Sequence, residues 1–218
     1  MPRGSQPKHV NARVLLEDSP RKWYVLGLSY VSYSHYTDRQ AELRNIWQST
    51  SSEVIEKVKS CLEIDNAVSH TKNKHIDPSR EDYFVYRLST TSPSVYTFMK
   101  EQGLHVPKRE RTFPEQVPLD LLPHFLRGFF DAKAALYHDK EGLLVCTLSY
   151  NPVFLEALAE KLKSQTAITK QRGTAIRTRK KYSGRNAFNI RDYLYQDLES
   201  ILQGGLYVPE RKDLFFRK

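Results

Sequence analysis

Apolar and polar residues follow the same order in both halves of the chain, and each half predicts helix, strand, strand, helix, strand, strand, helix. The second helix of each half is the clearest, because its apolar residues follow the 3.6-residue period of an amphipathic helix. Its apolar face repeats after about 100 residues: Val54, Ile55, Val58 and Leu62, then Phe154, Leu155, Leu158 and Leu162. A repeat of this length is typical of a duplicated half-domain with pseudo-two-fold symmetry.

Turn and capping residues give the expected boundaries of these elements. In the first half they are expected at about residues 18–31, 32–37, 40–47, 51–62, 67–71, 83–89 and 93–102. In the second half they are expected at about residues 118–132, 134–137, 143–148, 151–162, 176–182, 185–190 and 192–202. The pattern therefore predicts an α+β fold built from two pseudo-symmetric αββαββα repeats.

The chain divides into five segments. They are a basic N-terminal tail (1–17), a first repeat (18–105), a Pro-rich linker (106–117), a second repeat (118–203) and a C-terminal segment (204–218). The tail has no hydrophobic periodicity, and its Pro-Arg-Gly-Ser string resembles the remnant of an expression-tag cleavage site. The first twelve residues are therefore left out of the fold prediction.

The charge of the chain points to a polyanionic partner. Hydrophobic residues make up 39% of the chain, as in ordered globular proteins, and the net charge is +9. From Ser164 to Ile190 there is no Asp or Glu, but there are seven basic residues: Lys170, Arg172, Arg177, Arg179, Lys180, Lys181 and Arg185. A strand-forming stretch of one charge sign is typical of a surface that faces phosphates.

Several other classes of protein are disfavoured. No apolar run approaches the roughly 18 residues of a membrane span, and no signal peptide opens the chain, so we expect an intracellular protein without a membrane partner. Cys61 and Cys146 lack metal-ligand spacing and are expected to be buried thiols. The histidines form no HxH or HExxH pattern, and no Gly-rich phosphate loop, GxSxG or Walker string is present. Nucleotide hydrolysis and serine chemistry are therefore poorly supported.

The first helix of each half ends in a characteristic string: VLGLSYVSY at residues 25–33 and LRGFFDAKA at residues 126–134. Both resemble degenerate LAGLIDADG motifs of homing endonucleases. The endings YLYQD at 193–197 and LYVPERK at 206–212 are similar to the C-terminal signature of the single-chain members, and the resemblance covers about residues 20–215. It implies a monomeric saddle, with helices on the outer face and two sheets in the major groove of double-stranded DNA.

The resemblance also implies a role for the motif residues. In the family the two motif helices cross at the pseudo-dyad, and Gly27 and Gly128 would let their backbones approach closely. The eighth motif position is normally Asp or Glu, and the pair holds divalent metal ions. Here those positions are Ser32 and Lys133, a poor ligand and a cation. We therefore expect no catalytic residue and no metal cofactor, and Asp131 is expected to be structural.

Strand parity selects residues that would contact DNA. Arg177, Arg179 and Lys181 share one face of a predicted strand. On the next predicted strand Phe188 is expected to face the core with Ile190, which leaves Arg185 and Asn189 exposed. The residues expected to contact DNA are Tyr33, His35, Arg39, Gln40, Arg44, Lys72, Lys74, Lys133, Lys140, Lys170, Arg172, Arg177, Arg179, Lys181, Arg185, Asn189 and Lys212.

The expected function is binding of double-stranded DNA, sequence-specific and without cleavage, in the cytoplasm or nucleoid (or in an organelle for a eukaryotic intron-encoded relative). By analogy with degenerate LAGLIDADG-containing sporulation regulators of bacteria, the role would be transcriptional control. Three alternatives stay open. They are an active endonuclease that recruits Mg²⁺ through another carboxylate, an RNA-binding intron maturase, and a protein-interaction module whose basic surface is incidental.

Overall fold

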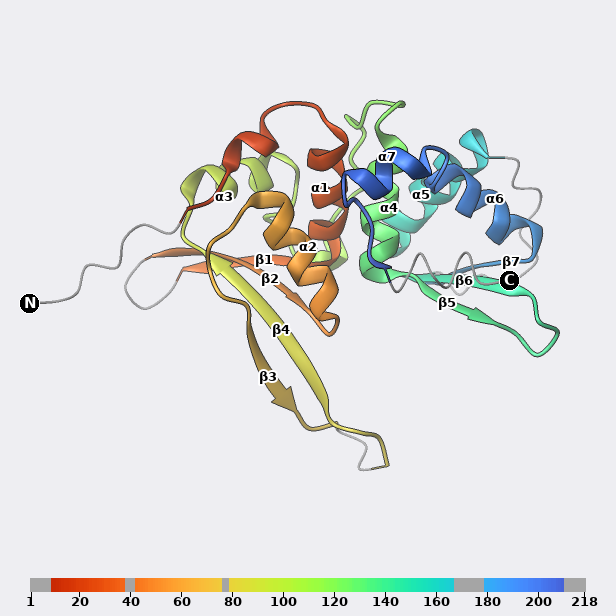
Figure 1. Ribbon diagram of the computed structural model, residues 1–218, viewed down its shortest axis with the longest axis horizontal. Coiled ribbons are helices and arrows are strands. Elements are labelled where there is room, and N and C mark those ends of the chain that lie inside the picture. Colours follow the sequence, from red (N-terminus) through yellow and green to blue (C-terminus); the bar gives the residue numbers. More distant parts are fainter. Residues whose placement is uncertain (1–8, 38–41, 76–78, 167–178, 210–218) are drawn as a thin grey trace, which may run out of the picture.

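The chain forms two halves that lie side by side, each with its helices above one antiparallel sheet (Figure 1). The structure is a computed structural model that describes residues 9–37, 42–75, 79–166 and 179–209. Helices α1 and α4, one from each half, run next to each other through the centre of the molecule. The observed fold is thus the predicted α+β arrangement, with the sheets in antiparallel pairing throughout the described residues.

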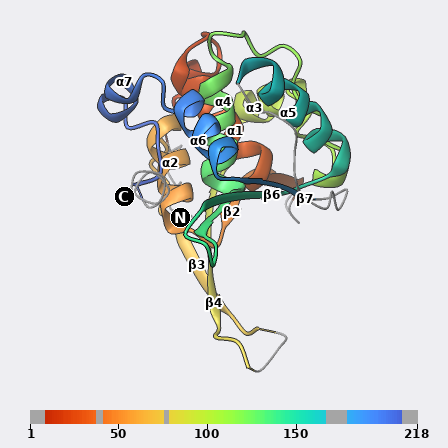
Figure 2. The same cartoon turned by 90° about the vertical axis from the view of Figure 1, so that its right-hand side faces the viewer.

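The first half has a four-stranded sheet in the order β1-β2-β4-β3. Its strands are β1 (Tyr33–Thr37), β2 (Leu43–Ser49), β3 (Ser69–Asn73) and β4 (Tyr83–Thr90). Its helices are the 3₁₀ turn η1 (Ala12–Leu15), α1 (Pro20–Ser32), α2 (Ser52–Leu62) and α3 (Pro93–Glu101). The outer strands β3 and β4 extend beyond the helices as a long hairpin (Figure 2).

The second half repeats this order with a described sheet of three strands, β5-β6-β7. Its strands are β5 (Ala135–His138), β6 (Leu144–Ser149) and β7 (Arg179–Ser183). Its helices are η2 (Lys108–Glu110), α4 (Leu122–Lys133), α5 (Pro152–Gln165), α6 (Arg185–Leu194) and α7 (Leu198–Gln203). Since β7 pairs with β6 as β4 pairs with β2, β7 is the counterpart of β4.

Local sequence explains where the helices begin. The side chains of Ser19, Ser51, Ser92 and Asn151 each accept a hydrogen bond from a backbone N–H in the first turn of α1, α2, α3 and α5. These side chains satisfy donors that a helix N-terminus otherwise leaves without partners. In α1, α3 and α5 a proline in the first turn adds a fixed φ where no N–H is needed.

The central helices α1 and α4 meet at Gly27 and Gly128. A Cβ atom placed on Gly27 would coincide with the carbonyl oxygen of Phe125 and lie 2.7 Å from the backbone nitrogen of Phe129. A Cβ atom on Gly128 would coincide with the carbonyl oxygen of Tyr24. Because backbone rather than side chain lies opposite each glycine, only glycine permits this approach. The contact joins the hydrophobic cores of both halves into one cluster.

The end of the second half differs from the sequence prediction. A strand is expected at about residues 185–190, but these residues begin helix α6. Ala187, Ile190 and Leu194 are buried at helical spacing, while Phe188, which was expected to face the core, is 41% exposed. The strand prediction is wrong because the same residues fit both periods, and burial follows the helical one.

The N-terminal segment also differs from the prediction. Residues 9–16 were expected to belong to the tail, but Leu15 is buried in the core. The backbone N–H of Asn11 donates to the carbonyl of Leu62 at the end of α2, and the Asn11 side chain donates to Glu63. The ordered first half therefore begins before residue 18.

Candidate nucleic-acid interface

Strand register divides each sheet into a face that packs on the helices and an outward face. In the first sheet Tyr33, Trp47 and Leu88 lie in register on the helix-facing side, and each is fully buried. Residues of the opposite parity form the outward face: Ser34, Tyr36, Arg44, Gln48 and Arg87. We use "outward face" for these residues and for their counterparts in the second sheet.

Basic and aromatic side chains meet on the outward face of the first sheet. The Arg87 guanidinium lies 5.7 Å from the centre of the Tyr36 ring and donates to its hydroxyl at 3.3 Å. Arg44 forms an ion pair with Glu42 at 2.8 Å. The sequence analysis did not select three residues of this face: Arg87, Tyr36 and Gln48. The apolar Trp47 could have indicated Gln48, because neighbouring residues of a strand point to opposite faces of the sheet.

Two of the selected residues in β1 lie on the helix-facing side. Tyr33 is fully buried, and its hydroxyl donates to the side-chain oxygen of Asn45 at 2.8 Å. His35 is half-buried, with its ring centre 5.2 Å from that of Tyr96. Burial is the main cause that lowers the pKa of His35. The prediction that Tyr33 contacts DNA is wrong, because β1 begins at Tyr33 with this side chain turned towards Trp47.

Lys72 and Lys74 lie on the protruding hairpin of β3 and β4. Lys72 forms an ion pair with Asp82 at 3.3 Å across the hairpin, and Lys74 is exposed just beyond the end of β3. Two large aromatic residues of β4, Tyr83 and Phe84, are 40% and 42% exposed there. The hairpin thus presents both cations and ring faces to solvent.

The outward face of the second sheet carries the predicted basic row in part. Arg179 and Lys181 are both exposed, while Tyr182 is buried on the opposite side of β7. Lys181 pairs with Thr147, and Arg179 pairs with Ser149 and donates to its hydroxyl at 3.3 Å. Lys140 is exposed in the turn between β5 and β6.

The remaining selected residues fall elsewhere. Arg185 and Asn189 belong to α6, which packs on β6 and β7, so they are not on a returning strand. Arg185 is exposed, and Asn189 is half-buried. The following selected residues lie outside the described residues: Arg39, Gln40, Lys170, Arg172, Arg177 and Lys212.

The ends of the two motif helices do not offer a metal site. The Ser32 side chain is buried, and its hydroxyl donates to the carbonyl of Leu28 at 2.7 Å. Lys133, the last residue of α4, is exposed. In the described ranges no three His, Cys, Asp or Glu side chains form a group that could hold a metal ion. Divalent ions need several oxygen ligands, so these residues do not fit the metal pair of a nuclease.

Asp131 has a structural environment, as its place in α4 led us to expect. It is buried and accepts hydrogen bonds from the Tyr24 hydroxyl at 2.7 Å and from the backbone N–H of Val208 at 2.9 Å. Its carboxylate therefore ties α1 and the C-terminal segment to α4. Burial, followed by the negative charge of Asp131, raises the pKa of the Tyr24 hydroxyl.

The linker supplies a buried cation at the same end of the helices. Arg111 is 3% exposed, and its guanidinium donates to the carbonyl oxygens of Tyr30 at 2.7 Å and Tyr33 at 2.9 Å. These carbonyls belong to the C-terminal turn of α1, which leaves acceptors without helical partners. The side chain of Asn151 donates to the carbonyls of Lys108 and Arg111, both at 2.9 Å, and so holds the linker in place. The sequence analysis treated residues 106–117 only as a linker and did not select Arg111.

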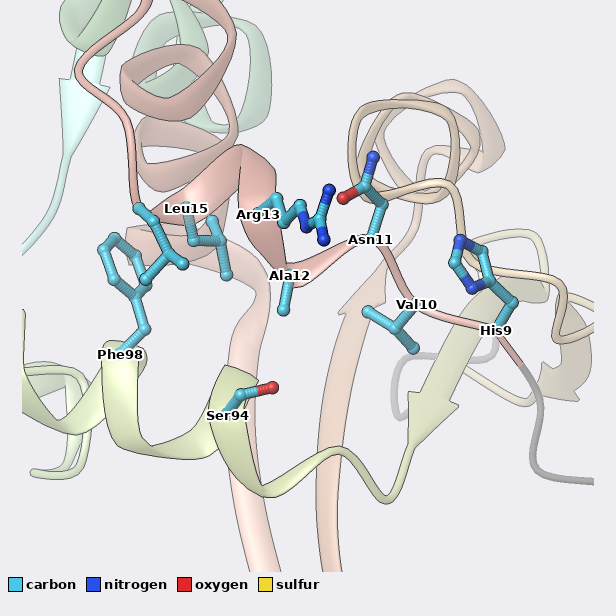
Figure 3. A pocket seen from close by; sticks show the side chains of 9 residues that line it. His9, Val10, Asn11, Ala12, Arg13, Leu15, Ser94 and Phe98 are labelled. Atoms are coloured by element: carbon cyan, nitrogen blue, oxygen red, sulfur yellow. The ribbon is translucent and has the colours of Figure 1, made fainter.

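A hollow lies away from both outward faces, between the N-terminal segment and α3 (Figure 3). Phe98 and Ser94 of α3 line one side, and residues 9–13, 15 and 16 line the other. Its lining is mainly apolar and holds no carboxylate or thiol. We therefore assign no chemistry to it. None of the helices in the described part of the chain is long and apolar enough to cross a membrane.

Comparison with solved structures identifies the class of fold. The structure is similar to that of "the homing endonuclease I-WcaI bound to its DNA recognition sequence", with a TM-score of 0.58 and 10% sequence identity over 92% of this chain and 88% of that one. The structure of the LAGLIDADG homing endonuclease I-GzeII in complex with its DNA target has a TM-score of 0.48 and 10% sequence identity, over 91% of this chain and 88% of that one. The structure of the N-terminal LAGLIDADG domain of DUF199/WhiA has a TM-score of 0.38 and 16% sequence identity, over 84% of this chain and 87% of that one.

The likeness to the I-WcaI structure shows that the chain has the fold of LAGLIDADG homing endonucleases, as the sequence motifs predicted. No protein-family model matches the sequence. No curated protein matches it either. The shared feature is therefore the fold, and the chemistry of this chain has to be argued from its own residues.

Proposed function

We propose that this protein binds double-stranded DNA across the outward faces of its two sheets, with sequence preference, as a monomer and without cutting it. Two observations carry the proposal. The outward faces of two sheets side by side carry Arg44, Arg87, Arg179 and Lys181, and the motif helices end in Ser32 and Lys133 instead of carboxylates. The I-WcaI structure, which has the same fold, is bound to its DNA recognition sequence.

The outward residues divide by the chemistry they can supply. Arg and Gln side chains on strands can bind base edges with two hydrogen bonds, and each good pair contributes about 1–3 kcal/mol of discrimination. Arg44, Gln48, Arg87 and Arg179 are of this kind. Lysines and the residues of the hairpin tips are suited to phosphate contacts, which position a protein without reading sequence.

Binding needs no cofactor in this proposal, because phosphates are neutralised by side-chain cations. Each neutralised phosphate releases condensed counterions, so log K against log salt gains a slope of about −0.9 per contact. A binder that uses both sheets should therefore show a steep dependence on salt. Binding without cutting would suit the control of transcription at an operator.

The test is a selection from random duplex DNA by the full-length protein, followed by incubation of the recovered duplex in Mg²⁺ and in EDTA. We expect one motif of about 15–25 base pairs, the site length that the resemblance to LAGLIDADG homing endonucleases implies, bound and left intact under both conditions. Cutting in Mg²⁺ alone would support an endonuclease with another metal ligand. Tighter binding of structured RNA at matched salt would support an RNA-binding protein, and a flat salt slope would leave only a protein-interaction module.

A further inference from the structure

A set of cations surrounds the point where the two motif helices end. Arg111 sits there with its guanidinium fixed by five backbone carbonyls, those of Ser29, Tyr30, Tyr33, Leu104 and Val106. Within the described residues no carboxylate forms an ion pair with it. Carbonyl groups at a helix C-terminus carry partial negative charge and stabilise a nearby cation, but they do not cancel it.

Two lysines stand near this arginine. Lys133 is exposed on the last turn of α4, and Lys108 is exposed at the start of the 3₁₀ turn η2, three residues before Arg111. The pKa of the Lys108 ammonium is lowered by partial burial first, and then by the positive charges of Arg111 and Lys133. The positive charges of Arg111 and Lys133 therefore both act on the Lys108 ammonium. Like charges held together favour the binding of an anion among them.

We infer that Lys108, Arg111 and Lys133 form a phosphate-binding centre at the meeting point of the two motif helices, and that the central phosphates of the bound duplex dock there. We call these three residues the cationic centre. The inference rests on the proposed function and deepens it by assigning the central contact. Lys108 and Lys133 touch the phosphate, while Arg111 holds the linker and adds its field.

The position of the cationic centre favours a DNA phosphate over other anions. α1 leads directly into β1, and α4 leads into β5 after one residue, so the centre lies between the two outward faces. A duplex that crosses both sheets must pass this point. Ammonium groups suit a single phosphate because each is a compact point charge. The Arg111 guanidinium is already held in place, so it loses no conformational entropy when the duplex binds.

The test uses the duplex recovered by selection, with pairs of neutral methylphosphonate linkages stepped along both strands. Affinity of the unchanged protein should fall most when the neutral linkages lie at the centre of the site. Lys108→Gln and Lys133→Gln should each weaken binding of the all-phosphate duplex several-fold and reduce the salt slope by about one. On the centrally neutral duplex the same variants should lose no further affinity, because the partner charge is already absent.

The matched control is Lys163→Gln on α5, a surface lysine that forms an ion pair with Glu160 of the same helix at 3.9 Å. It should bind both duplexes like the unchanged protein. If central neutral linkages cost no more than peripheral ones, or if the lysine variants lose as much affinity on both duplexes, the cationic centre is wrong although DNA binding stands. If no duplex is recovered or bound at all, the proposed function itself fails.

Discussion

Replacing Gly27 by alanine should separate the two halves of the core. The new Cβ would fall on the carbonyl oxygen of Phe125 and 2.7 Å from the backbone nitrogen of Phe129. Neither atom can rotate away as a side chain could, so α1 and α4 must move apart. Overpacking of a tight core costs about 1–3 kcal/mol, and we expect the upper end because backbone opposes backbone.

A gain in helix propensity acts in the opposite direction. Alanine is better than glycine inside a helix by about 1 kcal/mol. The net loss in the free energy of unfolding should therefore be about 2 kcal/mol for Gly27→Ala. Gly128→Ala should behave alike, since its Cβ would fall on the carbonyl oxygen of Tyr24 and 3.0 Å from the backbone nitrogen of Leu28.

Urea unfolding followed by tryptophan fluorescence measures this loss, because Trp23 and Trp47 are both buried. Gly204→Ala is the matched control. This glycine has ordinary right-handed backbone angles, and its nearest neighbours are one carbonyl oxygen at 3.2 Å and the movable side chain of Leu206. The free energy of unfolding of Gly204→Ala should differ from that of the unchanged protein by less than about 1 kcal/mol. If Gly27→Ala unfolded at the same urea concentration as the unchanged protein, the close approach of the helices would be refuted.

Three further results are expected. Placing carboxylates at the motif ends with Ser32→Asp and Lys133→Asp should not produce Mg²⁺-dependent cutting of the selected duplex, because Arg111 keeps positive charge at the helix ends. Cutting in Mg²⁺ but not in EDTA would contradict this expectation. Replacing Lys181 by Gln should reduce the salt slope of duplex binding by about one, and an unchanged slope would remove Lys181 from the phosphate contacts. Burial lowers the pKa of His124 to about 4, so the protein should lose stability as pH falls from about 6.5 towards 4. The midpoint of urea unfolding against pH, compared with that of His124→Gln, measures that loss, and parallel profiles would show that His124 does not cause it.

The sign of the pH effect follows from the environment of His124. Burial disfavours the charged imidazole in the folded protein, and the positive charge of Arg127 adds to the effect. The Arg127 guanidinium lies 2.8 Å from Nδ1 of His124, where a neutral ring accepts the hydrogen bond. Between the folded and unfolded pKa the unfolded chain therefore binds more protons, and acid favours unfolding.

The sequence predicted the parts of the fold that local periodicity controls. The apolar faces of α2 and α5 repeat at the same spacing, and both are buried as expected. Cys61 and Cys146 are buried, as the sequence analysis expected. The opposed glycines belong to motif strings that were visible in the sequence, although only the structure shows which backbone atoms lie against them.

The errors arose where tertiary contacts decide between two local options. Tyr33 was selected because it lies on the first hairpin, and only its packing against Trp47 shows that its side chain faces the core. In α6 the apolar residues fit a strand or a helix, and packing of Ile190 and Leu194 selected the helix. Arg111 could not be found from the linker alone, because its partners lie on α1, about 80 residues earlier.

The same scaffold explains both the binding surface and the expected loss of cleavage. Gly27 and Gly128 bring the ends of α1 and α4 together and so fix the two outward faces relative to each other. In a nuclease, carboxylates at these two ends would hold metal ions against the scissile phosphates. Here a buried serine, an exposed lysine and a buried arginine occupy the region, so the electrostatic field at the centre has the opposite sign. A positive centre still attracts the DNA backbone, but it repels the divalent ions that hydrolysis needs. In the proposed function, loss of cutting and retention of binding are therefore two consequences of one difference in charge at this centre.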